Sequence, residues 1–538
     1  MLMPRRPRSM LITLLSSTAL LLTACGTSSA GHGGSSADRT PKSGGTLTFA
    51  VSSDAGCVDP QQVGSNDTIY SLRQVVDSLT DQDPKTGKIV PWLARSWKVS
   101  KDSRTFTFTL RPGATFSDGT PVDAAAVKAD FDHVSSLGPL ASLATGYLSG
   151  YQGTKVIDAQ TAQVSFAQPN AQFLQATSTF SLGLVSTATL AKTPGQRCAE
   201  GVIGSGPFTL AKYVPNQSIT LKRRAGYNWG SSLWTKPGEA YLNSIVFKVV
   251  PESGVRLGSL QSAQVDAISS VGPQDEAAIR TGNSRLQARP NPGVVFSLEV
   301  NNSRPLLKDK AVRQAISEAI NRPEVVDTVL TKETKPATSI LASTTPLYTN
   351  LGRELAFDLP AAKTALQSDG WIPGPDGIRQ KAGQKLSLRV AWFANLATNK
   401  SVLELIQQEL KSAGIDLVLN EYPIAKVVAI QQAGDFDLAW GNVTRADPDI
   451  LRTLYSTRLS NYYRVPHTKL DPVLAGEAGS TDPAARGALV RQAQELIVGN
   501  FYAIPVVELT TVLGLSDDVH GLAFDASSRL QFHDTWKS

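Results

Sequence analysis

The chain has 538 residues, of which 41% are hydrophobic and 18% are charged, fractions that are typical of a globular protein and not of a disordered or fibrous one. Its formal net charge is +6, but Arg5, Arg6 and Arg8 lie in an N-terminal stretch without acidic residues; without these three, the 52 basic residues fall to 49, against 46 acidic ones. Since the remainder contains no long basic run, the sequence argues against binding of nucleic acid or of a membrane surface through charge.

The start of the chain predicts export followed by lipid attachment. The arginines precede an apolar stretch over 11–22, which is too short to span a bilayer as a mature helix. Residues 22–26, Leu-Thr-Ala-Cys-Gly, resemble the lipobox of bacterial lipoproteins, in which the cysteine becomes the lipidated N-terminus after cleavage. We therefore expect a signal peptide over 1–24, lipidation of Cys25, and a flexible tether over 25–45, which is rich in Gly, Ser and Thr. A plain secretory signal is the alternative.

Two further cysteines remain, Cys57 and Cys198. Neither lies in a CxxC motif, and no histidine stands near either one, so the sequence indicates neither metal binding nor catalysis by these thiols. Outside the reducing cytosol two cysteines can pair, and a disulfide between them would close a long loop and limit the unfolded chain. We expect this disulfide; two separate buried thiols are the alternative.

Hydrophobic periodicity predicts several elements in the first quarter of the chain. Residues 46–51 read as a strand, and the apolar residues of 69–79 recur at helical spacing. Two further strands follow, joined by a turn at 101–103. A helix then begins with Asp123 as its N-cap.

The second half of the chain alternates strands with helices. The pattern predicts a strand over 386–392, a helix over 401–412 and a strand over 415–419. Units of this kind imply a parallel or mixed sheet flanked by helices, and hence an α/β fold. A further short strand over 436–440 is followed by a polar, irregular segment.

Aromatic residues end two of these strands. Trp392 and Phe393 close one, and Trp440 closes the other, so we expect all three on the same rim of the sheet, where α/β proteins bind ligands. Core packing explains each tryptophan by itself, whereas two of them on one rim suit a role facing the ligand. The sequence leaves both readings open.

Catalytic and metal-binding motifs are absent from the sequence. The five histidines are scattered, with no HExxH motif and no spacing suited to zinc. No GxSxG elbow and no phosphate-cradling Walker loop occurs. We therefore expect no metal and no cofactor, and a protein that binds without performing a reaction.

As a set, the motifs resemble the family 5 solute-binding proteins of bacterial ABC importers, the peptide/nickel-binding class. Each motif is modest alone, but together they occur in the family's order over nearly all of residues 45–530. The matching segments are LARSWKVSKDSRTFTFTLRPGATFSDGTPVDAAAV at 93–127, GSGPF at 204–208, NNSRPLLKDKAVRQAISEAINRPEVV at 301–326, SVLELIQQELKSAGIDLVLN at 401–420, GDFDLAWGN at 434–442 and LVRQAQELIVGNFYAIPVVE at 489–508.

This resemblance implies a two-lobed, type II periplasmic-binding-protein-like clamshell that encloses its ligand. Lobe I would comprise residues 46–300 and 505–538, with an extra subdomain inserted at about 90–200, and lobe II residues 301–504. The hinge would lie at the two crossings, and closure there would select the ligand. The implied protein is a monomeric lipoprotein on the outer face of the cell membrane, which passes oligopeptides or similar small polar solutes to an ABC permease and its ATPase subunits.

Peptide-binding members often place an aspartate shortly after the strand's tryptophan, where it pairs with the ligand's amino group. Here Thr444 fills that position and Arg445 follows it, so the ligand is anionic, N-blocked or not a peptide, unless Asp447 takes the amine role. An ion pair of Arg445 with Asp447 or Asp449 is the alternative to ligand contact. The remaining candidates for the cleft are Ser53, Asp54, Phe296, Trp392, Phe393, Trp440, Asn442, Tyr462 and Tyr463.

Three other functions stay open on the sequence. A binder of nickel or of a metal chelate would share the fold, and a sensory lipoprotein could use it without transport. An exported hydrolase would need a nucleophile and a base that the sequence does not mark.

Overall fold

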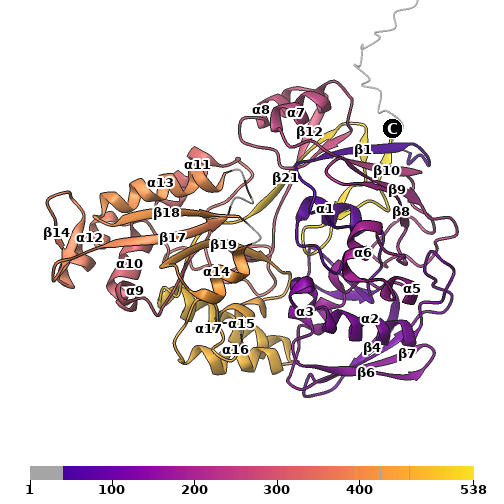
Figure 1. Cartoon of the computed structure of the whole chain (residues 1–538), viewed down its shortest axis with the longest axis horizontal. Helices are drawn as coiled ribbons and strands as arrows, with labels where there is room; N and C mark the ends of the chain where they lie inside the picture. The colour runs from indigo at the N-terminus through magenta and orange to yellow at the C-terminus, as the bar shows by residue number, and fades with distance from the viewer. Residues whose placement is uncertain (1–39, 394–395, 397, 424–425, 460) are drawn as a thin grey trace, which may run out of the picture. The chain divides into compact units, whose positions relative to one another are not determined.

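The computed structural model describes residues 40–393, 396, 398–423, 426–459 and 461–538. Pro41–Ser538 form one compact unit, in which two bodies of strands and helices lie side by side (Figure 1). The expected signal peptide, Cys25 and most of the expected tether lie outside the described residues. In the described ranges, no helix combines the length and the apolar character that crossing a bilayer would require.

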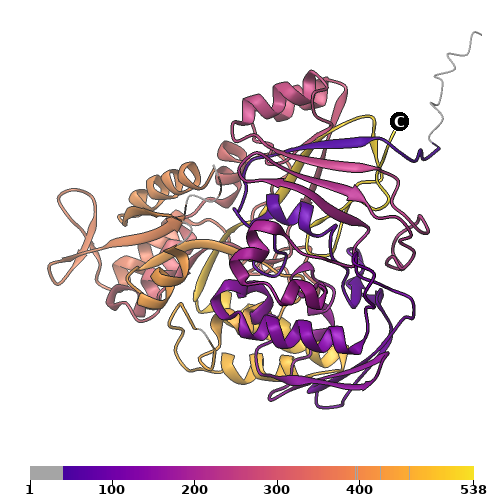
Figure 2. The ribbon, with the colours of Figure 1, turned by 45° about the vertical axis from the view of Figure 1, so that its right-hand side comes forward.

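Lobe I is built on a seven-stranded mixed sheet. Its central strand, β1 (Thr46–Val51), is the strand expected at 46–51 and pairs in parallel with β10 (Ser244–Val249) and β11 (Ala267–Ile268). Strands β8 (Phe208–Val214), β9 (Ser218–Arg223), β12 (Ser284–Pro290) and β21 (Thr510–Ser516) complete the order β12-β21-β11-β1-β10-β9-β8. The helices α7 (Ser253–Gln261) and α8 (Glu276–Thr281) lie against it at one end (Figure 2).

The chain returns to lobe I at its C-terminus. Phe532 packs edge-on against Phe49 of β1, with ring centroids 6.1 Å apart, and against Phe247 of β10, at 5.7 Å. The C-terminal segment therefore packs against the N-terminal strand. The short strands of the segment are β22 (Val519–His520), β23 (Ala523–Phe524), β24 (Leu530–Gln531) and β25 (Trp536–Lys537).

A four-stranded antiparallel sheet with its own hydrophobic core forms the inserted subdomain of lobe I. The expected turn at 101–103 joins β4 (Ala94–Val99) to β5 (Thr105–Leu110), which pairs with β7 (Thr161–Phe166), and β6 (Tyr151–Asp158) closes the edge. Asp123 caps α2 (Ala124–Ser136) as predicted, because its side chain accepts from the Ala126 amide at 2.9 Å. The smaller elements of this region are β2 (Thr80–Gln82), β3 (Ile89–Pro91), α3 (Ser142–Tyr147), α4 (Phe173–Ala176), α5 (Thr187–Leu190) and α6 (Pro194–Glu200).

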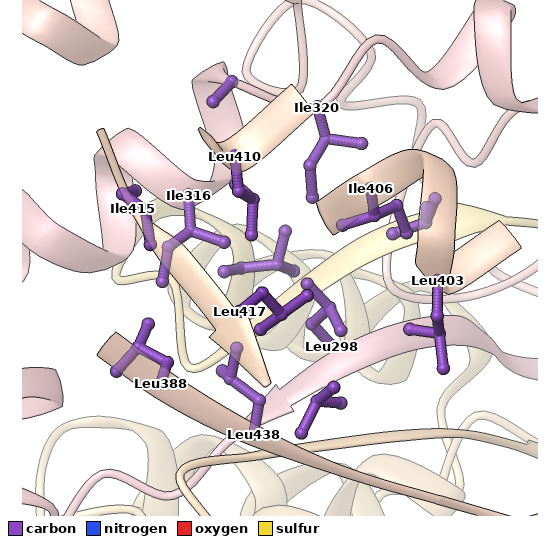
Figure 3. Packing of buried hydrophobic residues seen from close by; sticks show 14 of the residues in the cluster. Leu298, Ile316, Ile320, Leu388, Leu403, Ile406, Leu410, Ile415, Leu417 and Leu438 are labelled. Carbon is purple, nitrogen blue, oxygen red and sulfur yellow. The ribbon is translucent and has the colours of Figure 1, made fainter. Parts of the chain in front are cut away.

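Lobe II contains a five-stranded sheet in the order β18-β17-β19-β13-β20. The predicted strand–helix–strand unit is present as β17 (Ser387–Phe393), α13 (Asn399–Ser412) and β18 (Asp416–Tyr422), with the two strands parallel. Figure 3 shows the core between this sheet and the helices that cover it, in which Leu298, Leu388 and Leu438 meet Ile406 and Leu410 of α13.

Further helices complete the second lobe. They are α9 (Pro305–Lys308), α10 (Lys310–Glu318), α11 (Arg322–Val329), α12 (Leu359–Ser368), α14 (Val427–Ala433), α15 (Ile450–Tyr455), α16 (Leu470–Gly479) and α17 (Pro483–Gly499). The remaining strands are β13 (Gly293–Val300), β14 (Ile372–Pro373), β15 (Arg379–Lys381), β16 (Gln384–Lys385), β19 (Leu438–Thr444) and β20 (Ala503–Val507).

The crossings between the lobes differ from the expected boundaries at 300/301 and 504/505. The expected boundaries placed β13 in lobe I and split β20 at 504/505, whereas both strands belong to the lobe II sheet. The chain therefore crosses at Asn291–Pro292, after β12, and at Glu508–Leu509, before β21. The two crossings are bonded together, since the Asn291 amide donates to the Leu509 carbonyl oxygen at 2.7 Å.

The helix expected over 69–79 is shorter in the structure. Helix α1 spans Asn66–Leu72, and the chain then turns irregularly. The Arg73 guanidinium donates to the Ser78 hydroxyl at 3.0 Å and to the Val76 carbonyl oxygen at 3.4 Å. A side chain thus bonds a carbonyl that a continued helix would pair with a backbone amide. Val76 and Leu79 still reach the core, as their spacing suggested.

Cys57 and Cys198 form a disulfide in the structure. It ties the loop after β1 to α6, across a sequence separation of 141 residues. This is the pairing that the sequence analysis preferred over two separate buried thiols.

Candidate binding site between the two lobes

The two lobes touch each other in this structure. The Ala171 amide of the inserted subdomain donates to the Ala478 carbonyl oxygen of α16 at 2.8 Å. The guanidinium carbon of Arg445, in lobe II, lies 4.2 Å from the centroid of the Tyr147 ring, in lobe I. Both contacts must break when the lobes separate, so the structure represents a closed arrangement.

Two cavities lie between the lobes. The smaller, of about 20 Å³, has room for one or two water molecules, and the larger measures about 320 Å³, within the range of small-molecule sites. Leu143, Tyr147, Thr179, Phe180, Ser181, Thr444, Asp525, Ser527 and Arg529 line the smaller one. The larger is lined by residues 82–87, 343–346, Arg289, Ala446 and Ala526.

The two cavities lie on either side of two short segments. Thr444 faces the smaller cavity and Ala446 the larger, and in the loop of residues 525–529 Ala526 faces the larger while its neighbours Asp525 and Ser527 face the smaller. We therefore treat both cavities as one cleft and as the candidate binding site. Lobe I, its subdomain and lobe II all contribute to its walls.

Thr444 is the predicted site residue that the structure places on the wall of this cleft. It is the last residue of β19, which continues four residues beyond the expected strand end at Trp440. The extension is held by pairing with β13, in which Gly293 stands opposite Thr444. A side-chain pattern cannot reveal this pairing, because Gly441, Asn442 and Thr444 are typical loop residues.

Arg445 is buried, with 4% of its surface exposed, and Nη1 donates to Thr453 Oγ1 at 3.2 Å. The expected ion pair with Asp447 or Asp449 is wrong. Asp447 binds Arg486 of α17, with Nη2 and Oδ1 2.6 Å apart, and Asp449 binds Arg452 of its own helix at 2.7 Å. The packing of α15 and α17 brings Arg452 and Arg486 to these carboxylates. The local sequence around Arg445 does not indicate this arrangement.

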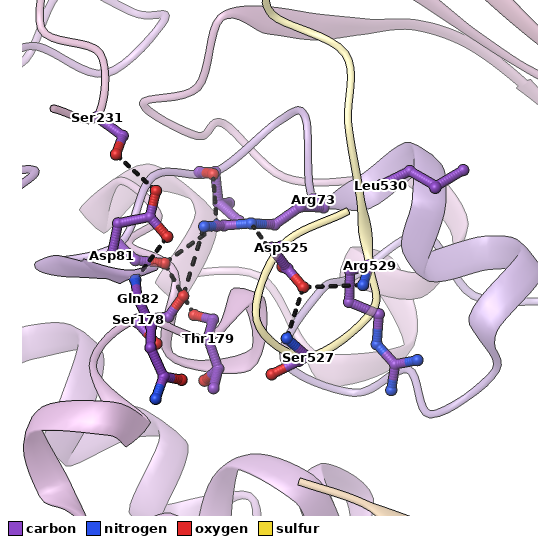
Figure 4. Close-up of polar contacts among 12 residues, drawn as sticks. Arg73, Asp81, Gln82, Ser178, Thr179, Ser231, Asp525, Ser527, Arg529 and Leu530 are labelled. Atoms are coloured by element: carbon purple, nitrogen blue, oxygen red, sulfur yellow. Dashed lines mark hydrogen bonds and ion pairs between the residues drawn. The ribbon is translucent and has the colours of Figure 1, made fainter. Parts of the chain in front are cut away.

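Arg529 and Asp525 belong to the lobe I wall of the smaller cavity. Figure 4 shows the polar contacts around them. The Asp525 carboxylate accepts from the amides of Ser527 at 2.9 Å and Arg529 at 2.8 Å, and its second oxygen lies 3.8 Å from Arg73 Nε. The Arg529 guanidinium therefore does not pair with it; it donates to the Asn66 side-chain oxygen instead. Figure 4 shows it pointing away from Asp525.

Tyr147 stands next to both arginines. Burial raises the pKa of its hydroxyl, and the guanidinium groups of Arg445 and Arg529 oppose that rise. The sequence analysis did not find Tyr147, Phe180 or Arg529. Their sequence neighbourhoods carry no signal, because it is the tertiary fold that brings them to the same cleft.

The expected aromatic rim lies in the core of lobe II. Trp440 is 3% exposed and stacks on Phe296, with ring centroids 5.1 Å apart and an interplanar angle of 17°. Its Nε1 donates to Asn399 Oδ1 at 3.0 Å. Trp392 belongs to the same hydrophobic core. In this structure Trp392 and Trp440 therefore pack in the core that α13 covers.

The other predicted residues of lobe II do not line either cavity. Phe393 is buried near Tyr422, at a centroid distance of 6.4 Å. Tyr463 is buried in the second core of lobe II, and the half-buried Tyr462 packs against that core. Asn442 lies within β19 and is half-buried.

Ser53 and Asp54 follow β1, as expected, but bind neighbouring groups in lobe I. The Ser53 amide donates to the Asp67 carboxylate at 3.0 Å. Asp54 accepts from the Tyr213 hydroxyl at 2.8 Å and from the Asn216 amide at 2.9 Å. Neither residue lines a cavity of the cleft.

Within the part of the chain that the structure describes, no group of three His, Cys, Asp or Glu side chains is arranged to hold a metal ion. The polar walls of the cleft carry several hydroxyl groups, the guanidinium groups of Arg289 and Arg529, the ammonium group of Lys85 and the carboxylates of Asp83 and Asp525. Such groups recognise a polar solute by hydrogen bonds and charge.

Comparison with known proteins shows similarity over most of the chain. The family model for bacterial extracellular solute-binding proteins, family 5 Middle, matches residues 88–463. The nickel-binding periplasmic protein of Escherichia coli (strain K12) is 27% identical over 386 residues, which are 70% of this chain and 71% of that protein. The glutathione-binding protein GsiB of the same strain is 26% identical over 506 residues, 91% of this chain and 94% of that protein.

Solved structures agree in fold. NikA from Brucella suis, in complex with Fe(III)-EDTA, has a TM-score of 0.79 and 25% identity, with 92% of this chain and 100% of that chain covered. The oligopeptide-binding protein AppA from Bacillus subtilis, in complex with a nonapeptide, has a TM-score of 0.76, with 93% and 100% covered. At 17% identity the second comparison supports the fold alone.

Proposed function

Since this chain belongs to family 5 of the bacterial extracellular solute-binding proteins, we propose that it captures an oligopeptide or a similar small polar solute between its lobes. It then delivers the solute to the membrane permease of an ABC importer. In this function the protein performs no reaction on the solute.

The cleft carries this proposal, because its walls come from both lobes. A solute held there contacts lobe I and lobe II at once, and only the closed form offers both sets of contacts. Binding therefore shifts the equilibrium between the open and closed forms towards the closed form. The size of the shift is set by the difference between the solute's affinities for the two forms. The crossings at 291–292 and 508–509 supply a two-strand hinge for this motion.

The N-terminal sequence supports the proposed location. A basic leader, a short apolar stretch and the lipobox-like residues 22–26 suggest cleavage before Cys25 and lipid attachment there. We propose that the protein works as a lipid-anchored monomer on the outer face of the cell membrane. Radiolabelled palmitate would be incorporated by the expressed wild type and not by Cys25→Ala; equal labelling of both would contradict the anchor.

Thermal unfolding with a ligand panel tests the proposed function. The panel contains di- to pentapeptides, glutathione, nickel with histidine, and sugars. A peptide present at about 100 times its dissociation constant stabilises the folded state by about 2.7 kcal/mol, which raises the Tm of a chain of this size by about 2–3 °C. Stabilisation by nickel with histidine alone would replace the peptide assignment with a chelate, and stabilisation by sugars alone would remove both.

A further inference from the structure

We propose that the cleft contains an oxyanion subsite, in which Arg445 from lobe II and Arg529 from lobe I bind a carboxylate group of the solute. This proposal rests on the proposed function only in that the solute enters between the lobes. It deepens that function by naming the chemical class of the solute, a small carboxylate.

Arg445 supplies positive charge that neighbouring acids do not neutralise. Among the described residues, no carboxylate lies within ion-pair distance of its guanidinium, although three acids stand nearby in the fold. Asp447 is bound by Arg486 at 2.6 Å, and Asp449 by Arg452 at 2.7 Å.

The third acid of that cluster, Glu477, is shielded as well. Burial, and then the carboxylate of Asp449, raises the pKa of Glu477 well above its ordinary value. It lies 3.0 Å from Arg486. All three acids thus contact arginines other than Arg445.

Arg529 supplies the second charge, on the opposite wall. Its side chain is 5% exposed and lines the smaller cavity. Its Nε atom is buried and has no hydrogen-bond partner, while Asp525, the nearest acid in sequence, is occupied by two backbone amides and faces Arg73. A buried guanidinium donor without a partner is costly, and an oxyanion would satisfy it.

Tyr147 contacts Arg445, which itself lines neither cavity, and shares the smaller cavity with Arg529. Its ring covers the Arg445 guanidinium at 4.2 Å and its side chain lines the same cavity as Arg529. Because Arg445 and Tyr147 belong to different lobes, opening the cleft uncovers the guanidinium to an entering solute. The Tyr147 hydroxyl is a further donor for an oxyanion.

This arrangement couples closure to the charge of the solute. Closing the cleft brings two cations from opposite lobes into a region of low dielectric, where they repel each other more strongly than in water. A carboxylate placed between them replaces repulsion by two charge-assisted contacts. A neutral analogue of the same shape supplies no such compensation.

A matched pair of small probes tests the subsite directly. Succinate and succinamide have the same carbon skeleton and differ in charge, and each is added to the full chain at fixed ionic strength while the Tm is measured. We expect succinate to raise the Tm and succinamide to leave it unchanged. Equal shifts with both probes, or no shift with succinate, would overturn the proposal.

Four arginine variants and a control refine the test. Arg445→Gln and Arg529→Gln each weaken succinate binding by about ten- to a hundredfold, the size expected for loss of one charge-assisted contact. Arg445→Lys and Arg529→Lys keep the charge and retain part of the response, which separates loss of the subsite from loss of folding. Arg491→Gln changes an exposed arginine on α17 and leaves the response at the wild-type level. An unchanged response in both glutamine variants would place the bound anion elsewhere.

The peptide panel distinguishes failure of this proposal from failure of the proposed function. Peptides with a free C-terminal carboxylate are compared with their amides. If peptides with a free C-terminal carboxylate and their C-terminal amides bind equally well, the proposed subsite is refuted and the solute-binding function stands. If succinate binds through both arginines while no peptide does, the subsite stands and the peptide assignment is lost.

Discussion

Glu299 makes the stability of lobe II depend on pH in a way that one substitution can isolate. The residue lies on β13, an inner strand of the lobe II sheet, and is 2% exposed. Both of its carboxylate oxygens accept from the Tyr455 hydroxyl, at 3.0 and 2.8 Å. Burial raises its pKa to about 8, although the hydrogen bond from Tyr455 opposes this.

The direction of the effect follows from this raised pKa. The folded protein binds the Glu299 proton more tightly than the unfolded chain does, whose glutamate has an ordinary pKa of 4.5. The stabilising contribution is therefore complete below about pH 4.5 and is lost as the pH rises towards 8. Between about pH 5 and about pH 8 the loss is on the order of 3–4 kcal/mol, from 1.36 kcal/mol for each pH unit between the two pKa values.

Glu299→Gln keeps the shape and the acceptor for Tyr455 and removes the ionisation. We expect the variant and the wild type to have similar free energies of unfolding near pH 5, and the variant to be more stable by about 3–4 kcal/mol near pH 8. Other buried acids with raised pKa, such as Asp130 and Asp77, act on both proteins alike and cancel in the difference.

Denaturant unfolding followed by tryptophan fluorescence across this pH range measures the difference. Glu354→Gln, which alters an exposed glutamate, is the matched control and should follow the wild type at every pH. Parallel curves for Glu299→Gln and the wild type would refute the reasoning, because they would show that Glu299 is ionised in the folded protein at neutral pH.

Three further changes test other parts of the structure. Replacing Cys57 and Cys198 by serine releases a loop of 141 residues and should lower the free energy of unfolding by about 4–5 kcal/mol; a Tm equal to that of the wild type would show that the disulfide does not hold the native protein. Asp447→Asn leaves Arg486 without its closest carboxylate partner and should cost about 3–5 kcal/mol in denaturant unfolding, as for other broken buried pairs; a loss below about 1 kcal/mol would place this pair with solvent-exposed ones. Trp440→Phe keeps a ring against Phe296 and removes the hydrogen bond to Asn399, so stability should fall by about 1–2 kcal/mol with ligand affinity unchanged; a specific loss of affinity in calorimetry would return Trp440 to the binding site.

Much of the local structure could be predicted because local signals decide it. The alternating pattern of residues 46–51, the turn at 101–103 and the cap at Asp123 each involve residues close together in sequence. The helix over 401–412 has an apolar face and a glycine stop at Gly414, which adopts a φ of 86°. The structure extends this helix by two residues to 399–412 and otherwise agrees.

The lobe boundaries could not be predicted in the same way. The run at 293–300 is mostly apolar and reads as a buried strand, but that pattern suits the core of either lobe. Only its pairing with β19 and β20 assigns it to lobe II. The first crossing, at 291–292, therefore lies about nine residues before the expected boundary at 300/301. The second crossing, at 508–509, lies a few residues after the expected boundary at 504/505.

The binding cleft shows the same division between local pattern and tertiary contact. The sequence by itself determined that the chain forms two α/β lobes, that it binds a solute without catalytic motifs, and that the segment after Trp440 departs from the usual amine-binding position. The tertiary structure decided which side chains meet there: Tyr147 and Arg529 come from segments nearly 400 residues apart, and Arg445 loses its expected partners to arginines on other helices. Local patterns report only whether a residue is buried, whereas the partner of a buried charge depends on which helices pack beside it, and that is settled by the whole fold.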